Sequence, residues 1–199
     1  MKTDRLEYFS DAVFAIVITL LIIDVHLPAN WTSGLGNALV ALWPSYLAYA
    51  VSFFVIGAIW INHHGMFQLI VRADNSFLLL NVLQLMAIAF IPFPTAVLAE
   101  SIHAGSGMST AIVFYGGTLV SVGVTVNLMW RYAVRAGLVR DDITPAKVKL
   151  LNRRFLLGPA AYVVAVAVGL AFPWAALAIF VGINVYFLWP RWKRKARSE

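Results

Sequence analysis

The sequence predicts an all-α integral membrane protein, in which six transmembrane helices per subunit form a single domain over residues 1–199. Hydrophobic residues make up 61% of the chain and charged residues only 12%, whereas soluble domains contain roughly 45–50% apolar residues. Several apolar stretches also reach the ~20 residues that a helix needs to cross a bilayer. The basic residues lie at the two ends of the chain and in alternate loops between these stretches, which would all be on one side of the membrane, as in a multi-pass protein.

Windows of about 19 mostly apolar residues predict the first four spans at residues 9–27, 39–62, 77–98 and 110–130. No A-x-A-like cleavage site follows the first run, so we expect a retained helix rather than a signal peptide. The last apolar run, 155–189, is too long for one crossing. Pro173 lacks a backbone N–H and stands beside Trp174, which favours the interface, and we expect a turn there between spans at 155–171 and 174–189.

All 15 Lys and Arg residues precede the first span, follow the last, or lie in the loops after spans two and four. The opposite loops carry only Asp24 and Glu100 as full charges. Because cytoplasmic loops collect basic residues, both termini are expected to be cytoplasmic. We interpret the basic C-terminal tail as a contact with anionic lipid and not with nucleic acid. Between spans four and five, Thr144 and Pro145 suit the start of a short interfacial helix.

The first helix carries an ionisable cluster, Arg5 with Phe9-Ser10-Asp11, where it enters the membrane. At ~100° per residue an apolar stripe with one hydroxyl follows, and Asp11 points away from it. The members of this stripe are Ala12, Ile16, Thr19, Leu20, Ile23 and Leu27. Ordinary packing within a helix bundle would also account for such a stripe.

The second span ends in Trp60, His63 and His64 on the same predicted side as Arg5 and Asp11. Polar groups at membrane depth must satisfy one another, so we expect Arg5, Ser10, Asp11, Trp60 and one histidine to form a hydrogen-bonded network. Adjacent histidines point about 100° apart and the chain has no cysteine, which disfavours a metal site. No catalytic triad or carboxylate pair is evident, so we expect neither an enzyme nor a cofactor.

Three elements of the sequence form a recognisable set: the RxxxFSD motif (Arg5 to Asp11), Trp60-x-x-His63-His64-x-x-Phe67, and Pro92-Phe93-Pro94-Thr95. Together they resemble the prokaryotic branch of the transmembrane protein 175 potassium channels. The resemblance implies a potassium-permeable homotetramer in which the first helix lines the pore. It implies that Ile16 is the principal hydrophobic constriction and that Thr19 and Ile23 are further pore-facing layers. It also implies that Arg5, Phe9, Ser10, Asp11, Trp60 and His64 hold the pore helix and support gating.

No carbonyl filter resembling TVGYG is present, because Tyr115-Gly116-Gly117 lies inside the fourth span, where small residues permit close helix contact. A constriction formed by one isoleucine from each subunit would instead favour K⁺, because K⁺ loses its hydration water at a lower free-energy cost than Na⁺. Asp24 could concentrate cations at the outer mouth, or be a solvated helix end. The main alternative is a secondary transporter of a cation or small solute, with Pro92 and Pro94 as its helix break. We expect residence in a prokaryotic plasma membrane.

Overall fold

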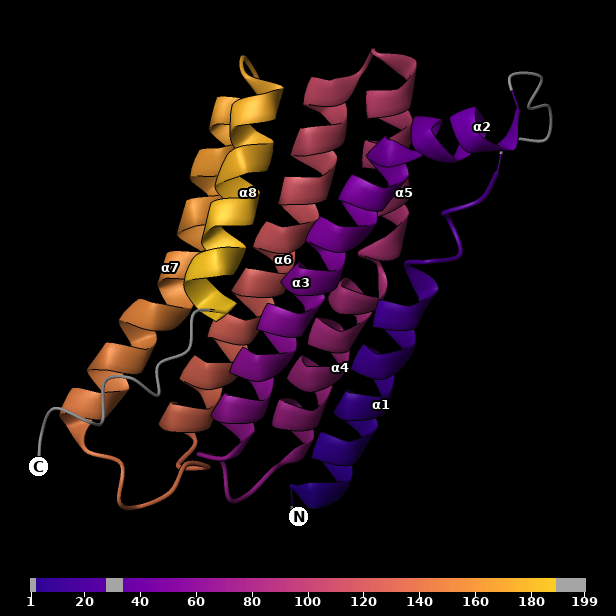
Figure 1. Cartoon of the computed structure of the whole chain (residues 1–199). Coiled ribbons are helices and arrows are strands. Elements are labelled where there is room, and N and C mark those ends of the chain that lie inside the picture. The colour runs from indigo at the N-terminus through magenta and orange to yellow at the C-terminus, as the bar shows by residue number, and fades with distance from the viewer. Residues whose placement is uncertain (1–2, 28–33, 189–199) are drawn as a thin grey trace, which may run out of the picture.

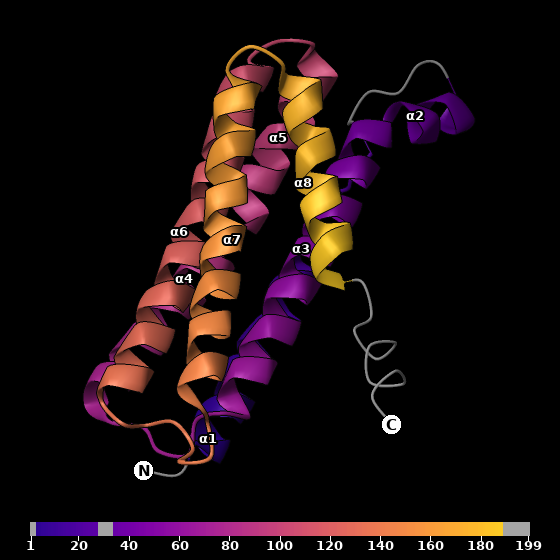
Figure 2. The ribbon, with the colours of Figure 1, turned by 90° about the vertical axis from the view of Figure 1, so that its left-hand side faces the viewer.

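A computed structural model describes residues 3–27 and 34–188, and the regular elements in these ranges are all α-helices (Figure 1). The helices over Met108–Arg135 and Pro145–Gly169 pack as antiparallel neighbours (Figure 2). The elements are α1 (Asp4–Leu20), α2 (Leu35–Ala41), α3 (Trp43–Phe67), α4 (Asn75–Ala89), α5 (Pro92–Ala104), α6 (Met108–Arg135), α7 (Pro145–Gly169) and α8 (Pro173–Leu188).

Four helical stretches in the described ranges are long and apolar enough to cross a membrane: Trp43–Phe67, Asn75–Ala104, Met108–Arg135 and Pro145–Gly169. The second of these combines α4 and α5. Helix α1 has 17 residues and α8 has 16, somewhat fewer than the ~20 of a typical span. The number of crossings therefore depends on α1 and α8, and six crossings with cytoplasmic termini stay a prediction.

Helix α1 ends at Leu20, before the limit of residue 27 that the hydropathy suggested. The chain continues in tighter turns, in which Ile23 N–H donates to Leu20 O at 3.1 Å and Val25 N–H donates to Ile22 O at 3.1 Å. These bonds join residues three apart, as in a 3₁₀-helix with 3.0 residues per turn. The α-helical wheel therefore does not place Ile23 and Leu27, although it places Ile16 and Thr19.

The predicted third span is interrupted between α4 and α5. Pro92 and Pro94 have no backbone N–H to donate, and α4 ends at Ala89 while α5 begins at Pro92. At the start of α4, Asp74 accepts hydrogen bonds from Phe77 N–H at 2.8 Å and from the Tyr132 hydroxyl at 2.7 Å. Both bonds lower the pKa of the Asp74 carboxyl, the one from the Phe77 backbone more than the one from Tyr132. The bond from Tyr132 also ties the start of α4 to α6.

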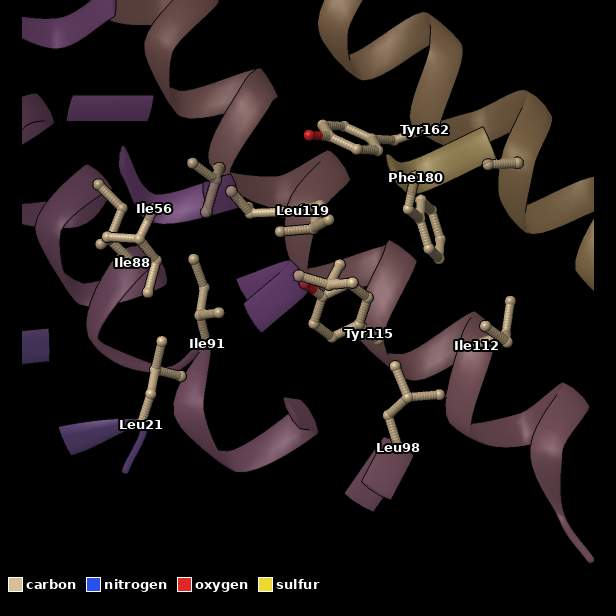
Figure 3. Packing of buried hydrophobic residues seen from close by; sticks show 14 of the residues in the cluster. Leu21, Ile56, Ile88, Ile91, Leu98, Ile112, Tyr115, Leu119, Tyr162 and Phe180 are labelled. Carbon is tan, nitrogen blue, oxygen red and sulfur yellow. The ribbon is translucent and has the colours of Figure 1, made fainter. Parts of the chain in front are cut away.

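A chain of buried hydroxyl groups joins three helices near this interruption. The Thr95 hydroxyl donates to Ile91 O at 2.8 Å and lies 2.8 Å from Ser52 Oγ, which lies 3.0 Å from the Tyr115 hydroxyl. Because the Thr95 proton is already used, Ser52 donates to Thr95 and Tyr115 donates to Ser52. Figure 3 shows Tyr115 among the apolar side chains of this core, beside Phe180. These hydrogen-bonded hydroxyl groups fix the rotation of α3, α5 and α6 relative to one another.

Helices α7 and α8 partly follow the sequence expectations. The chain turns at residues 170–172, just before Pro173, as predicted. Thr144 accepts the backbone N–H of Lys147 and Pro145 follows it, so the predicted helix start is confirmed. The expectation of a separate interfacial helix is wrong, because the helix continues without a break from Pro145 to Gly169. No glycine or proline stands between Pro145 and Gly158 to end it.

Helix α1 lies at one side of the bundle and α7 at the opposite side (Figure 1). Helix α1 packs against α3 and α4, whereas α7 packs against α6 and α8. At the end of the bundle where α3 and α8 begin, the rings of Trp43 and Trp174 stack with their centroids 6.4 Å apart. Within residues 3–27 and 34–188, one long side of α1 is therefore left exposed.

We predict that Gly116→Ala destabilises the protein and that Gly117→Ala does not. An added Cβ at Gly116 would collide with Val166 Cγ2 of α7 and lie 3.0 Å from Phe180 Cζ of α8, whereas one at Gly117 meets nothing within 4 Å. Overpacking of this kind costs about 1–3 kcal/mol. Thermal unfolding of the detergent-solubilised variants measures the difference. Equal melting temperatures would contradict the close packing of α6 on α7 and α8.

Candidate functional site on helix α1

Helix α1 has a buried face that attaches it to the bundle. Leu6, Ser10, Phe14 and Val17 are buried, and they recur at the spacing of one helix face. Phe14 and Val17 join the main apolar core, and Leu6 joins a second apolar cluster nearer the start of the helix. The packing therefore fixes which side of α1 faces inward.

The part of the predicted stripe that lies on α1 occupies its other side, and its members Ala12, Ile16, Thr19 and Leu20 are exposed. Ile23 and Leu27, beyond the end of α1, are exposed as well. Ile16 is 58% exposed and Ile23 66% exposed. The Thr19 hydroxyl donates to Ile16 O at 2.8 Å, so the lone pairs of its oxygen remain as acceptors for a neighbouring group. Asp24 is exposed just beyond the helix end. The face thus offers an apolar surface, one hydroxyl oxygen and a terminal carboxylate.

A polar cluster at the side of α1, here called the Asp11 cluster, links it to the end of α3. Trp60 Nε1–H donates to Asp11 Oδ1 at 2.8 Å. The ring of Trp60 stacks on the ring of His64, with centroids 5.8 Å apart and planes inclined at 22°. His64 Nδ1 lies 2.8 Å from Glu7 Oε1, and Gln68 Nε2 lies 2.9 Å from His64 Nε2. Two carboxylates of α1 are therefore held by two side chains of α3.

A second polar cluster, the Ser10 cluster, lies inside the bundle. The Ser10 hydroxyl donates to Leu6 O at 2.8 Å and accepts Asn81 Nδ2–H at 3.0 Å. Asn81 Oδ1 lies 3.1 Å from His63 Nε2. Ser10, Asn81 and His63 are all buried, and the His63 ring stacks on Phe67 at 4.3 Å between centroids. The cluster joins α1, α3 and α4 in surroundings where an unpaired polar group costs several kcal/mol.

The single network expected from the sequence is therefore two separate clusters. Asp11, Trp60 and His64 come together, but Ser10 lies about 100° around the helix from Asp11 and faces the interior. Arg5 makes no hydrogen bond or ion pair with any residue in 3–27 or 34–188. Arg5 and Phe9 share the exposed face with Ile16, because positions 5, 9, 12 and 16 repeat at i, i+4, i+7 and i+11.

Sequence reasoning missed Glu7, Asn81 and His63 as members of these clusters. Glu7 stands four residues before Asp11, on the same side of the helix, which was an available signal. Asn81 is a polar residue inside an apolar stretch, which also marks it as needing a partner. For the two adjacent histidines no local signal was available, since the sequence does not tell which one faces the interior.

The two histidines enter different clusters, with His63 buried beside Asn81 and His64 beside Glu7. Within the part of the chain that the structure describes, no group of three or more His, Cys, Asp or Glu side chains is placed to hold a metal ion. The contacts of the two histidines attach α1 to α3 and α4.

Comparisons with known proteins identify relatives that cover most of the chain. The family described as Endosomal/lysosomal potassium channel TMEM175 matches residues 5–92, which contain both clusters and all of α1 except its first residue, Asp4. A potassium channel of Chamaesiphon minutus is 37% identical over 191 residues, covering 94% of this chain and 93% of the relative. A potassium channel of Streptomyces collinus is 42% identical over 180 residues, covering 89% and 86%.

The fold matches a solved structure of the same group. The crystal structure of a lysosomal potassium-selective channel TMEM175 homolog from Chamaesiphon minutus superposes with a TM-score of 0.84 at 36% sequence identity. The match covers 93% of this chain and 95% of that one. The similarity therefore extends over the helices after residue 92 as well as over the region that the family description matches.

We predict that Ser10→Ala destabilises the protein, whereas Ser121→Ala leaves it nearly unchanged. Removing the Ser10 hydroxyl takes from buried Asn81 the oxygen that accepts its Nδ2–H, and an unsatisfied buried donor costs about 1–3 kcal/mol. Ser121 is exposed and donates only to Thr118 O of its own helix. Thermal unfolding in detergent compares the two variants. A Ser10→Ala variant as stable as Ser121→Ala would show that the Ser10 cluster does not hold α1.

Proposed function

The chain belongs to the TMEM175 family, and on this basis we propose that it forms a potassium-selective or potassium-preferring cation channel lined by the exposed face of α1. The supporting observation is that α1 has two different faces. Its inner face is packed against α3 and α4, and its outer face is exposed among the residues that the structure describes. A bilayer crossed by such helices exposes this face either to lipid or to other copies of itself.

In this proposal, an apolar constriction takes the place of a carbonyl filter. Rings of Ile16 from several copies would narrow the path and cannot replace the water around an ion, which favours the cation with the weaker hydration. Thr19, with its proton donated to Ile16 O, would present an acceptor oxygen next to this ring. Ile23 would form a further apolar layer, and Asp24 would raise the local cation concentration at the outer mouth.

The two polar clusters would hold α1 in this orientation. The Ser10 cluster anchors the inner face and the Asp11 cluster anchors the side, so rotation of α1 would break Ser10–Asn81 and Trp60–Asp11 together. Arg5, which lies on the exposed face, would meet a neighbouring subunit and not its own chain. Gating would then involve Arg5, Phe9, Ser10, Asp11, Trp60 and His64 as supports of the pore helix, without contact to the ion.

A single helix cannot enclose a path, so the proposal requires several copies, and a homotetramer with cyclic symmetry is the arrangement that we propose. The bacterial relatives, together with four membrane-length apolar stretches, support a prokaryotic plasma membrane as the location. The permeant ion is K⁺, and no cofactor is involved.

Flux measurements on purified protein in liposomes test the function. We predict that the protein passes K⁺ faster than Na⁺ and that Ile16→Asn weakens this preference several-fold, because an amide wets and widens the constriction. Val163→Asn is the matched control, since Val163 is also exposed but lies on α7, at the opposite side of the bundle.

The pore assignment is wrong if ion preference is unchanged after Ile16, Thr19 and Ile23 are altered in turn. Slow, saturable, proton-coupled uptake would instead favour a secondary transporter of a cation or small solute. The interruption between α4 and α5 is the observation that would suit this alternative, because transporters commonly bind substrate at broken helices.

We predict that the detergent-solubilised protein has four times the mass of one chain, which is 22.0 kDa. Light scattering that subtracts the bound detergent measures this mass. Since the exposed face of α1 would be covered only in the assembly, a monomer in gentle detergent that still conducts K⁺ in liposomes would contradict the proposed architecture.

A further inference from the structure

A groove runs along the bundle between α3, α6 and α7, and the end of α8 borders it. Its cavity volume is about 70 Å³, it is partly open to the surroundings, and its walls are almost entirely apolar. Ile59 comes from α3, Val122 from α6, Pro159 and Tyr162 from α7, and Phe187 from α8. The proposed channel function assigns no role to this groove.

Apart from the Tyr162 hydroxyl, the polar groups among the side chains that line the groove belong to Asn62 and Arg154, which lie at one end of it. Asn62 follows Ile59 along α3, while Arg154 precedes Pro159 and Tyr162 along the antiparallel α7. From Arg154 to Tyr162 the helix rises about 12 Å at ~1.5 Å per residue. The groove is therefore amphipathic. A cationic side chain lies at the end nearer the start of α7, and the largely apolar part extends from there for about two helical turns along α7.

A hydrogen bond holds the cation in place at the groove end. Arg154 Nη2–H donates to Asn62 Oδ1 at 2.8 Å, and this contact is partly buried. A planar guanidinium recognises phosphate oxygens in a fixed geometry, which an ammonium does not. Lys147, seven residues earlier on α7, is exposed on the same side of the helix and adds a second positive charge.

We propose that this groove binds one anionic phospholipid, with an acyl chain along Pro159 and Tyr162 and its phosphate against the guanidinium of Arg154. The match is one of charge and polarity, since basic pockets between transmembrane helices suit lipid phosphates and the apolar walls suit a hydrocarbon chain. The groove is lined by α7, which lies at the opposite side of the bundle from α1. An assembly around α1 therefore leaves the groove open to the bilayer.

The chain's own C-terminal segment is a poorer occupant. Residues 189–199 lie outside the described residues, and their basic side chains would be repelled by Arg154. These are Arg191, Lys193, Arg194, Lys195 and Arg197, against one acidic residue, Glu199. The same positive charge would instead strengthen the attraction of this part of the protein for anionic lipid.

Native mass spectrometry of the full-length protein tests the proposal, with phosphatidylglycerol or phosphatidylcholine of identical acyl chains added to the detergent. We expect one phosphatidylglycerol per chain to bind more tightly than phosphatidylcholine. Arg154→Gln should raise the phosphatidylglycerol concentration for half occupancy about tenfold, the loss expected for a charge-assisted hydrogen bond. Arg153→Gln is the matched control, because Arg153 is an exposed neighbour that does not line the groove.

A second variant tests the apolar part of the groove, including the case in which Arg154→Gln fails to fold. An added Cβ at Gly158 meets Phe187 only at ordinary contact distance, 3.7 Å, so Gly158→Leu should fill the groove and weaken binding of both lipids. Equal binding of the two lipids by the natural protein would overturn the proposal. So would equal losses in Arg153→Gln and Arg154→Gln, or displacement of phosphatidylglycerol by an equal concentration of inorganic phosphate.

Discussion

The need to pair polar side chains inside an apolar bundle is the constraint on which the arrangement of the helices depends. Ser52, Thr95 and Tyr115 form one hydroxyl chain across α3, α5 and α6, and Ser10, Asn81 and His63 form another group across α1, α4 and α3. Apolar side chains would tolerate several rotations of a helix in lipid. A buried hydrogen bond does not, because an unpaired donor there costs several kcal/mol.

The orientation of α1 follows from this constraint. With Ser10 bonded to Asn81, Phe14 and Val17 face the core, and Ile16 and Thr19 must face outward. The Asp11 cluster adds a contact at the side, where Trp60 reaches from α3. The RxxxFSD motif thus positions the helix with its serine and aspartate, while its arginine and phenylalanine lie on the outward face. Membership of a potassium channel family gives this outward face its proposed role.

Local signals predicted much of the fold. Pro173 marked the turn between α7 and α8, and Thr144 with Pro145 marked the start of α7, because capping and the missing proline N–H act within a few residues. The end of α1 at Leu20 was not predictable from hydropathy, since the residues that follow are equally apolar and differ only in adopting tighter turns. The continuous α7 was missed because its first turns are polar and resemble a loop.

The sequence by itself determined the class of protein and the stripe on α1, because composition and periodicity are properties of single segments. The side of the membrane that carries the basic residues stays a prediction from the sequence. Only the tertiary structure decided which residues pair. It separated His63 from His64, brought Asn81 to Ser10, and placed Gly116 but not Gly117 against α7 and α8. It also formed the groove that ends at Arg154. These features depend on the rotation of each helix relative to its neighbours, and that rotation is set by contacts between residues far apart in the chain.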